Sequence, residues 1–272
     1  MHEDLLQEAA GALRVTRDGG VVTVELHRPE RHNAISFAMW SAFGRLMPAL
    51  AQDDGVDVVV VRGTPGGPFS AGADISEFTE LRRESADAER YGAAVEGGEA
   101  AILAFPKPTV ALVQGWALGG GTQVAAACDL RVCDETARFA VTPAKLGIVY
   151  ALPSTARLVD VVGQAWAGWF LLTGEQVDAA TALRIGLVHE VLPAERVADR
   201  AYELAGLLGA RARVSLTGAK QLLARVAAGR RDVDDDVLGL YRGSWASAEY
   251  AEGVEAFLGK RAPDFRAARS RP

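Results

Sequence analysis

The sequence predicts an α/β protein with a largely parallel β-sheet and a helical region at its C-terminal end. Apolar runs rich in valine, at residues 57–62 and 109–113, are each followed by a glycine-rich turn and then by a helical pattern. Strands that alternate with helices in this way are typical of parallel pairing. From residue 154 onward the pattern is mostly helical. We therefore expect a core at residues 1–200 and a helical, oligomer-forming region at residues 201–272.

The chain is expected to begin with a β-hairpin and a helix. Residues 12–17 and 21–26 are strand-like and flank Asp-Gly-Gly at 18–20, which is a clear hairpin signal. A serine in position to act as an N-cap then begins a helix at residues 36–51. We expect Pro48 to kink or shorten that helix, because proline lacks the amide hydrogen and clashes with the preceding turn.

The middle of the chain is expected to alternate between strands and helices. The strand at 57–62 leads through a glycine turn to a charged surface helix at 74–104, which we expect to break at the glycine pair 97–98. The strand at 109–113 leads through a second glycine turn to a helix at 120–128. Further short strands are expected at residues 130–133, 138–141 and 187–192.

Composition and charge argue against several classes of protein. The chain has 272 residues, of which 49% are hydrophobic and 24% are charged, as in ordinary globular proteins. Its apolar runs are too short to cross a bilayer, and its acidic start lacks a signal-peptide pattern, so we expect a cytoplasmic location. A net charge of −6 argues against nucleic acid as a partner, although a few local Arg and Lys residues suffice to bind a phosphorylated ligand.

Cysteine and histidine usage gives no indication of a metal site. The two cysteines, Cys128 and Cys133, lie in a hydrophobic segment and are expected to be buried, reduced thiols. The four histidines are scattered and form no metal-binding motif. We therefore expect no metal.

Two segments rich in small residues follow the buried strands. In Pro-Phe-Ser-Ala-Gly-Ala-Asp-Ile (68–75), small side chains allow a ligand to approach the backbone closely. In Leu-Gly-Gly-Gly (118–121), the glycines begin a helix and expose free N–H groups at the positive end of its dipole. Such a helix start binds a phosphate, a carboxylate or an enolate oxygen equally well. Either segment alone is also compatible with an ordinary tight turn.

Together, Phe-Ser-Ala-Gly-Ala-Asp-Ile and Gly-Trp-Ala-Leu-Gly-Gly-Gly resemble the two signature segments of the crotonase (enoyl-CoA hydratase/isomerase) superfamily. The resemblance extends over nearly the whole chain, residues 12–265, and includes the segments 28–36, 172–175, 182–188, 252–257 and 260–261. It implies a crotonase-like spiral of ββα units with a C-terminal helical region, assembled as a homotrimer or a dimer of trimers. It also implies an acyl-CoA thioester as substrate, with coenzyme A as part of that substrate and no separate cofactor.

The resemblance also implies roles for particular positions. The N–H groups of Ala73 and Gly120 would form an oxyanion hole for a thioester enolate, and two fixed donors of this kind suit that task physically. The positions that match the family's coenzyme A site are Arg31, Ala34, Ala71, Asp74 and Ile75. Phe257 and Lys260 match positions that a relative lends to the coenzyme A site, often from a neighbouring subunit.

The chain departs from the family pattern at the two glutamates that the hydratases use to add water. Gln123 stands at the first of these positions and Pro143 at the second. Glutamine does not ionise and proline carries no polar side-chain group, so hydration by two carboxylates is not open to this chain. Relatives that isomerise dienes or displace halide carry an aspartate where this chain has Ala151.

Three acidic residues elsewhere remain as candidates for acid/base work, namely Glu77, Glu96 and Glu99. Glu96 and Glu99 lie on the helix expected at 74–104, and we expect both to be solvent-facing charges. The sequence therefore offers no acid in the usual place and no clear substitute for it.

The segment Thr-Pro-Ala-Lys-Leu-Gly-Ile-Val-Tyr (142–150) is similar to the corresponding segment of methylmalonyl-CoA decarboxylases. In that branch, a tyrosine at the position of Tyr150 lies near the departing carboxylate. Loss of CO2 forms the enolate directly, so the pocket needs no base, and a glutamate there would repel the substrate. Tyr150 is equally compatible with an aromatic side chain that only lines the pocket.

Three functional hypotheses follow from the sequence. The first is an acyl-CoA enzyme of the crotonase type, whose step is decarboxylation or another reaction through an enolate. The second is a non-catalytic acyl-CoA binding protein. The third is a serine hydrolase, since Pro-Phe-Ser-Ala-Gly at 68–72 is one residue short of a nucleophile motif. The third lacks the opening glycine, and His189 is its sole downstream histidine.

Overall fold

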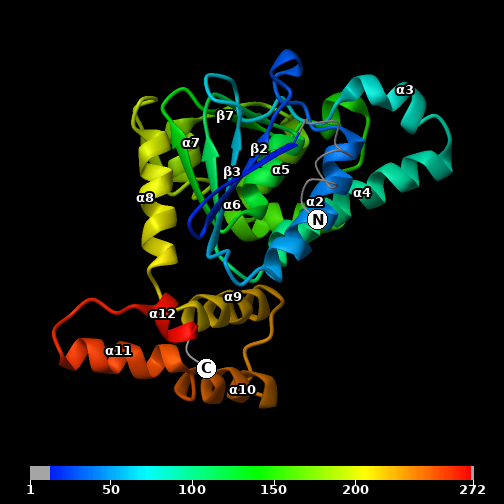
Figure 1. Cartoon of the computed structure of the whole chain (residues 1–272). Coiled ribbons are helices and arrows are strands. Elements are labelled where there is room, and N and C mark those ends of the chain that lie inside the picture. Colours follow the sequence, from blue (N-terminus) through cyan, green and yellow to red (C-terminus); the bar gives the residue numbers. More distant parts are fainter. Residues whose placement is uncertain (1–12, 271–272) are drawn as a thin grey trace.

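The computed structural model describes residues 13–270 and is built around a six-stranded β-sheet (Figure 1). In spatial order its strands are β1 (Leu13–Asp18), β2 (Val21–Leu26), β3 (Val58–Gly63), β4 (Thr109–Val113), β6 (Leu130–Asp134) and β9 (Glu190–Leu192). β1 and β2 form an antiparallel hairpin, whereas every other neighbouring pair is parallel. The predicted hairpin and the α/β fold with a largely parallel sheet are confirmed.

A smaller, three-stranded sheet brings two loops together. It consists of β5 (Trp116–Leu118), β7 (Arg138–Ala140) and β8 (Val177–Asp178). β5 falls inside the segment that was predicted to be a glycine turn. It forms a strand because it pairs in parallel with β7, and Ser70 forms a parallel bridge to Ala117 within it. This pairing fixes the glycines at 119–121 next to the small-residue segment 68–75.

Helices cover both faces of the large sheet. α2 (Phe37–Ala51), α4 (Ser85–Leu103), α5 (Gly120–Ala127) and α6 (Leu152–Thr173) enclose the main apolar core. α8 (Val197–Gly209) covers the opposite face. In β3, Val59 and Val61 belong to the main core, whereas Val58 and Val60 pack against α8, as the alternation of a strand requires.

Short elements connect these layers. They are η1 (Pro29–Arg31), η2 (Ile75–Glu77), α3 (Phe78–Leu81), η3 (Pro143–Leu146) and α7 (Ala179–Arg184). η2 and α3 follow the first small-residue segment, and η3 begins at Pro143, one of the two positions where the chain lacks a hydratase glutamate.

The structure bears on two expectations about helix breaks. α2 is not shortened by Pro48 and continues to Ala51, with Met47 and Leu50 on either side of the proline buried in the core. α4 runs through Gly97 and Gly98 without interruption, and the helical segment breaks earlier, at residues 82–84. Gly98 serves packing instead, since a methyl group on its Cα would lie 2.7 Å from the carbonyl oxygen of Trp40 in α2. The glycine therefore lets α2 and α4 pack closely.

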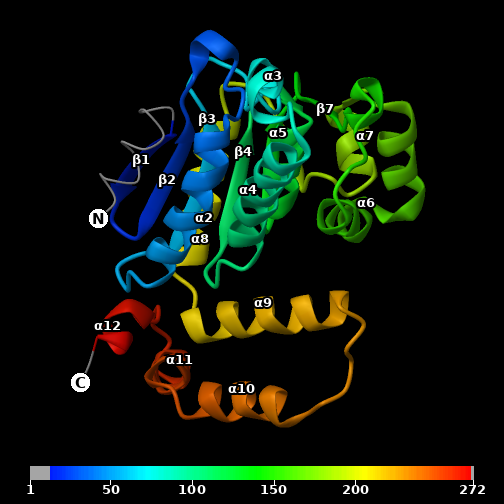
Figure 2. The same cartoon turned by 90° about the vertical axis from the view of Figure 1, so that its right-hand side faces the viewer.

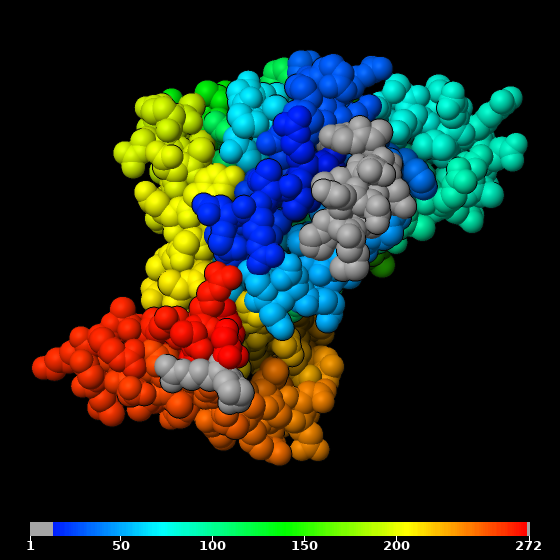
Figure 3. Space-filling view, in the orientation of Figure 1, coloured from blue at the N-terminus to red at the C-terminus, as the bar shows by residue number. Residues whose placement is uncertain are grey.

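The last four helices form a separate layer, which lies below the sheet in Figure 1 and projects as a distinct lobe in the space-filling view (Figure 3). They are α9 (Arg213–Ala227), α10 (Asp235–Trp245), α11 (Ala248–Leu258) and α12 (Phe265–Arg269). The C-terminal helical region is thus confirmed. The boundary expected at residue 200 falls inside α8, which still packs on the sheet, so the helical layer begins at α9.

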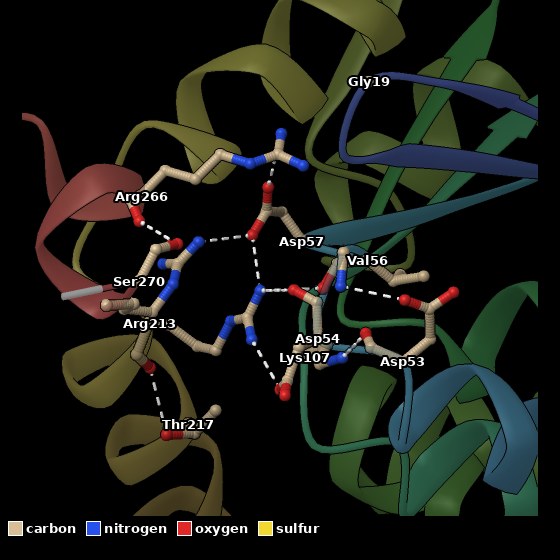
Figure 4. A network of polar contacts seen from close by, with 12 residues as sticks. Gly19, Asp53, Asp54, Val56, Asp57, Lys107, Arg213, Thr217, Arg266 and Ser270 are labelled. Atoms are coloured by element: carbon tan, nitrogen blue, oxygen red, sulfur yellow. Dashed lines mark hydrogen bonds and ion pairs between the residues drawn. The ribbon is translucent and has the colours of Figure 1, made fainter. Parts of the chain in front are cut away.

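A network of arginines and carboxylates attaches this layer to the core (Figure 4). The Asp57 carboxylate, which immediately precedes β3, accepts hydrogen bonds of 2.7 Å from both Arg213 and Arg269. Arg266 lies 3.5 Å from the same carboxylate. Glu249 of α11 accepts hydrogen bonds from the first two backbone N–H groups of α9, at 2.8 and 2.7 Å, and so acts as its N-cap from another helix.

Within residues 13–270, no helix is both long enough and apolar enough to cross a membrane. The same part of the chain contains no group of three or more His, Cys, Asp or Glu side chains placed to hold a metal ion. Cys128 and Cys133 are buried, as predicted, and burial raises the pKa of each thiol to about 12.

Candidate active site

A cavity of about 510 Å³ lies between the two small-residue segments, helix α4 and the segment 142–151. Its wall contains several residues to which the sequence assigned a role, namely Ala71, Ala73, Ile75, Gly120, Gln123 and Tyr150. Trp40, Phe78 and Tyr91 add aromatic surface to the wall. A partly enclosed apolar cavity with a few polar groups is typical of a small-molecule site.

The backbone N–H groups of Ala73 and Gly120 lie next to each other in this wall. Neither donates a hydrogen bond to another residue in the described part of the chain. A methyl group built on the Cα of Gly120 would lie 3.4 Å from the Ala73 nitrogen, which shows how close the two segments are. Gly120 is the first residue of α5, where the helix dipole is positive. Two adjacent free donors at such a point suit an enolate oxygen.

Glycine is required where these two segments touch. Gly72 has a φ of 106°, and a methyl group on its Cα would lie 2.9 Å from the carbonyl oxygen of Leu118. Gly119 has a φ of 50°, and its N–H donates to the Ala140 carbonyl at 2.7 Å. A side chain at either glycine would therefore push apart the segments that carry the Ala73 and Gly120 donors.

The segment before α2 pairs with the turn that carries Ala73. The Ile35 N–H donates to the Gly72 carbonyl at 2.7 Å, and the Ile35 carbonyl accepts from the Asp74 N–H at 3.0 Å. This pairing brings Arg31 and Ala34 close to the 71–75 segment, as a shared coenzyme A site requires. Arg31 is exposed and forms no ion pair within residues 13–270.

The Asp74 side chain holds this turn together and does not line the cavity. Its carboxylate accepts from the backbone N–H of Ser76 at 3.1 Å and lies 2.8 Å from the Arg28 guanidinium. Burial alone would raise the pKa of Asp74, but hydrogen bonds from Ser76 and Arg28 hold it below its ordinary value. Asp74 therefore stays ionised and contributes to the site by fixing its backbone.

Phe257 lies in the last turn of α11 and Lys260 follows that helix, in the helical layer that Figure 2 shows below the sheet. Phe257 is 83% exposed, and neither residue lines the cavity. Within one chain, the structure does not bring these two residues together with the other expected site residues.

Glu99 is buried behind the cavity wall, so the expectation that it faces solvent is wrong. Its carboxylate accepts hydrogen bonds from the Gln123 side-chain amide at 2.7 Å and from the Ser154 hydroxyl at 2.5 Å. The Gln123 amide also donates to Ser154 at 2.9 Å. Burial raises the pKa of Glu99, and the two hydrogen bonds only partly oppose that effect. Glu96, by contrast, is exposed, as expected.

Tyr150 joins the same group of residues, which we call the polar cluster (Glu99, Gln123, Ser154 and Tyr150). Burial raises the pKa of the Tyr150 phenol, the Glu99 charge raises it further, and a hydrogen bond with Ser154 opposes both effects. The Tyr150 hydroxyl therefore stays protonated at neutral pH. Tyr150, Ser154 and Gln123 line the cavity, whereas Glu99 lies behind them.

The sequence carried a signal for the position of Glu99 but none for its partner Ser154. Glu99 is in phase with Tyr91, Val95 and Ile102, which form the inward-facing stripe of α4. A lone carboxylate on an apolar helical stripe is expected to be buried and hydrogen-bonded. Ser154 follows a proline near the start of α6, and nothing in its neighbourhood in the sequence indicates that it meets Glu99.

Ser70 is not placed to act as a nucleophile. Its side chain is fully buried, its hydroxyl accepts the Gly72 N–H at 3.1 Å, and it does not line the cavity. His189 is engaged elsewhere, where its ring accepts the backbone N–H of Arg131 at 3.1 Å. The geometry therefore argues against the serine hydrolase hypothesis.

Comparisons with known proteins identify the family to which the chain is related. The family model for enoyl-CoA hydratase/isomerase matches residues 16–268. The 2,3-dehydroadipyl-CoA hydratase of Escherichia coli is 32% identical over 263 residues, which are 93% of this chain and 98% of that protein. The carnitinyl-CoA dehydratase of Salmonella typhi is 33% identical over 257 residues, which are 93% of this chain and 97% of that protein.

Solved structures with this architecture include an enoyl-CoA hydratase/carnithine racemase from Magnetospirillum magneticum. It superposes with a TM-score of 0.90 at 31% identity, over 93% of this chain and 95% of that one. An enoyl-CoA hydratase from Mycobacterium smegmatis superposes with a TM-score of 0.83 at 32% identity, over 93% of this chain and 98% of that one.

Proposed function

This chain belongs to the enoyl-CoA hydratase/isomerase family, and we propose that it acts on an acyl-CoA thioester through an enolate held by the N–H groups of Ala73 and Gly120. The observation that carries the proposal is the pair of adjacent free donors in the cavity wall. Donors fixed by the fold stabilise a developing oxyanion without reorganisation, and removal of one such donor typically costs about 10²–10³-fold in rate.

The reaction step is not the two-glutamate addition of water. Gln123 lines the cavity at the first glutamate position, and its amide hydrogens are directed to Glu99 and Ser154. Pro143 lines the cavity at the second position and has no group that transfers a proton. Glu96 lines the cavity but is exposed. Glu99 is buried and reaches the cavity wall through the other members of the polar cluster.

The more specific reaction that we propose is decarboxylation of a 2-carboxyacyl-CoA. The bond between carbon 2 and the carboxylate breaks, CO2 leaves, and the electron pair becomes the enolate double bond. Tyr150 suits the task of orienting the carboxylate, because its ring excludes water and its protonated hydroxyl donates to one polar partner. Holding the breaking bond perpendicular to the thioester plane lets its electrons enter the enolate.

Carbon 2 of the enolate must then take up a proton, and the polar cluster is suited to supply it. The raised pKa of Glu99 keeps a larger fraction of that carboxyl protonated near neutral pH than an exposed glutamate would have. The Ser154 hydroxyl is bonded to Glu99 and also lines the cavity, so it passes the proton on. Glu99 regains its proton from water at the end of the cycle.

The coenzyme A part of the substrate is proposed to lie along Arg31, Ala34, Ala71, Asp74 and Ile75, chiefly through the backbone. The active assembly is proposed to be a homotrimer or a dimer of trimers, in which Phe257 and Lys260 reach the site of a neighbour. This proposal is supported by large exposed apolar side chains on α9 to α11, among them Leu223 (69%), Trp245 (63%) and Leu258 (76%).

A mass-spectrometric screen of the purified protein tests these proposals together. The panel comprises enoyl-, malonyl-, methylmalonyl- and saturated acyl-CoA thioesters. We expect CO2 release from a 2-carboxyacyl-CoA and little hydration of the enoyl thioesters. Binding of acyl-CoA without turnover of any member would instead favour the non-catalytic binding protein.

A further inference from the structure

A cation with no carboxylate partner among residues 13–270 lines one wall of the cavity. Arg82 stands between α3 and α4, and its guanidinium carbon lies 4.1 Å from the centroid of the Phe78 ring and 4.5 Å from that of Tyr91. No carboxylate within residues 13–270 lies within ion-pair distance of it. The other cation of the wall, Lys145, pairs with Glu175 at 3.3 Å. Because aromatic rings occupy its π face, Arg82 retains its N–H donors in the guanidinium plane.

The same wall holds buried polar atoms that lack any hydrogen-bond partner among the described residues. They are Arg82 Nε, the Tyr91 hydroxyl and Trp40 Nε1. A buried polar group left unsatisfied costs about 1–3 kcal/mol, and native proteins keep few of them. All three groups are donors, and two of them belong to the stacked pair Arg82 and Tyr91. These three donors would be satisfied by a ligand group rich in acceptor oxygens.

The acidic side chains around this wall do not serve as the missing partner. Glu96 lines the cavity but is exposed and forms no ion pair with Arg82. Glu77 accepts the backbone N–H of Phe37 at 2.7 Å instead. Asp74 is paired with Arg28. Arg82 thus gives the cavity a local positive charge although the chain as a whole carries a net charge of −6.

We propose that Arg82 and Tyr91 form a subsite for a carboxylate borne by the acyl chain of the thioester, remote from the carbonyl that the Ala73 and Gly120 donors hold. The inference rests on the proposed function and names its substrate class, an acidic acyl-CoA. A guanidinium recognises a carboxylate through two parallel hydrogen bonds, and the buried phenol adds a third donor. This carboxylate is not the one that is lost, because an ion pair would stabilise it against departure.

Matched pairs of unreactive thioesters test the subsite directly. Succinyl-, glutaryl- and adipoyl-CoA are compared by calorimetric titration with butyryl-, pentanoyl- and hexanoyl-CoA, which have the same chain lengths but end in a methyl group. We expect at least one dicarboxylic member to bind about 10- to 100-fold more tightly than its partner, as for a hydrogen bond to a charged group. The Arg82→Met variant should lose that preference and keep its affinity for the uncharged chains.

Arg83→Met is the control variant, since Arg83 is the next residue, is exposed and does not line the cavity. It should keep the preference for the acidic chains. Equal binding of both series by the wild type would overturn the subsite and leave the proposed function intact. If Arg82→Met loses affinity equally for both series, with an unchanged circular dichroism spectrum, Arg82 binds the coenzyme A part. That result would also overturn the subsite. Failure of both series to bind the wild type would contradict the proposed function itself.

Discussion

Replacing Gly120 with proline removes one oxyanion donor with little disturbance of the helix it begins. Proline is well tolerated at the first position of a helix, where the N–H has no intrahelical partner, and Gly120 is the first residue of α5. The substitution also introduces a Cβ atom. That atom would lie 3.0 Å from the Trp40 ring and 3.4 Å from the Ala73 nitrogen, so a steric effect must be separated from the loss of the donor.

The Gly120→Ala variant makes this separation, because it adds the same Cβ atom and keeps the N–H group. The difference between the two variants therefore measures the donor. We expect kcat of Gly120→Pro to lie about 10²–10³-fold below that of Gly120→Ala, which corresponds to about 2.7–4 kcal/mol of lost transition-state stabilisation. The kcat of Gly120→Ala should itself lie below that of wild type, because the added Cβ atom would lie 3.0 Å from the Trp40 ring and requires the ring to shift slightly.

The assay is steady-state turnover of whichever thioester the wild type accepts, followed by mass spectrometry, with the fold of each variant checked by circular dichroism. Affinity for free coenzyme A should stay near the wild-type value in both variants, since the donor acts on the thioester oxygen alone. Equal turnover by well-folded Gly120→Pro and Gly120→Ala would refute the assignment of this N–H group to the oxyanion hole.

Three further measurements, one on the wild type and two on variants, test the other parts of the site. Hydration of crotonyl-CoA by the wild type should be orders of magnitude slower than in a two-glutamate hydratase, since each acid/base group contributes about 10²–10⁴-fold in rate. Ordinary hydratase rates would show that Gln123 and Pro143 do not stand at the positions of the two glutamates, or that hydration does not need them. Tyr150→Phe keeps the wall and loses the hydroxyl, so it should lower CO2 release from methylmalonyl- or malonyl-CoA without weakening acyl-CoA binding, and unchanged release would remove Tyr150 from the reaction. Burial raises the folded-state pKa of Glu99, so the folded chain retains a proton that the unfolded chain releases. The contribution of protonated Glu99 to the free energy of unfolding is therefore full at low pH and is lost as pH rises through the folded-state pKa. The urea midpoint of Glu99→Gln should therefore fall less than that of wild type as pH rises through the same range, and parallel pH profiles would argue against a raised pKa.

The backbone part of the site was predictable from the sequence because glycine marks positions where the backbone adopts a positive φ or approaches another segment closely. Gly72 and Gly119 adopt positive φ values, and the segments that contain them are readable as ligand-binding turns without knowledge of the fold. The proximity of the two segments is also predictable, since each follows a buried parallel strand, β3 or β4, by a few residues, and neighbouring parallel strands end at the same edge of a sheet.

The side-chain part was less predictable, because it depends on packing between distant helices. Glu99 was expected to face solvent from its charge alone, although its phase on α4 places it among apolar residues. Its partner Ser154 lies 55 positions away along the chain, and nothing local joins the two. The glycine pair at 97–98 was similarly misread as a helix break, because only the packed structure reveals that Gly98 lies against Trp40. Phe257 and Lys260 remain assigned by resemblance, since their proposed role requires a second chain.

The proposed function requires that an enolate forms in the cavity and is held by the Ala73 and Gly120 donors. Its most direct test is deuterium incorporation at carbon 2 in D2O, measured by mass spectrometry over a panel of 2-carboxyacyl-, 3-enoyl- and saturated acyl-CoA thioesters. We expect wild type to place deuterium at carbon 2 of a product, with release of CO2 from a 2-carboxyacyl-CoA. Gly120→Pro should do so far more slowly than Gly120→Ala. A well-folded wild type that binds acyl-CoA but incorporates no deuterium from any member of the panel would contradict the proposed function.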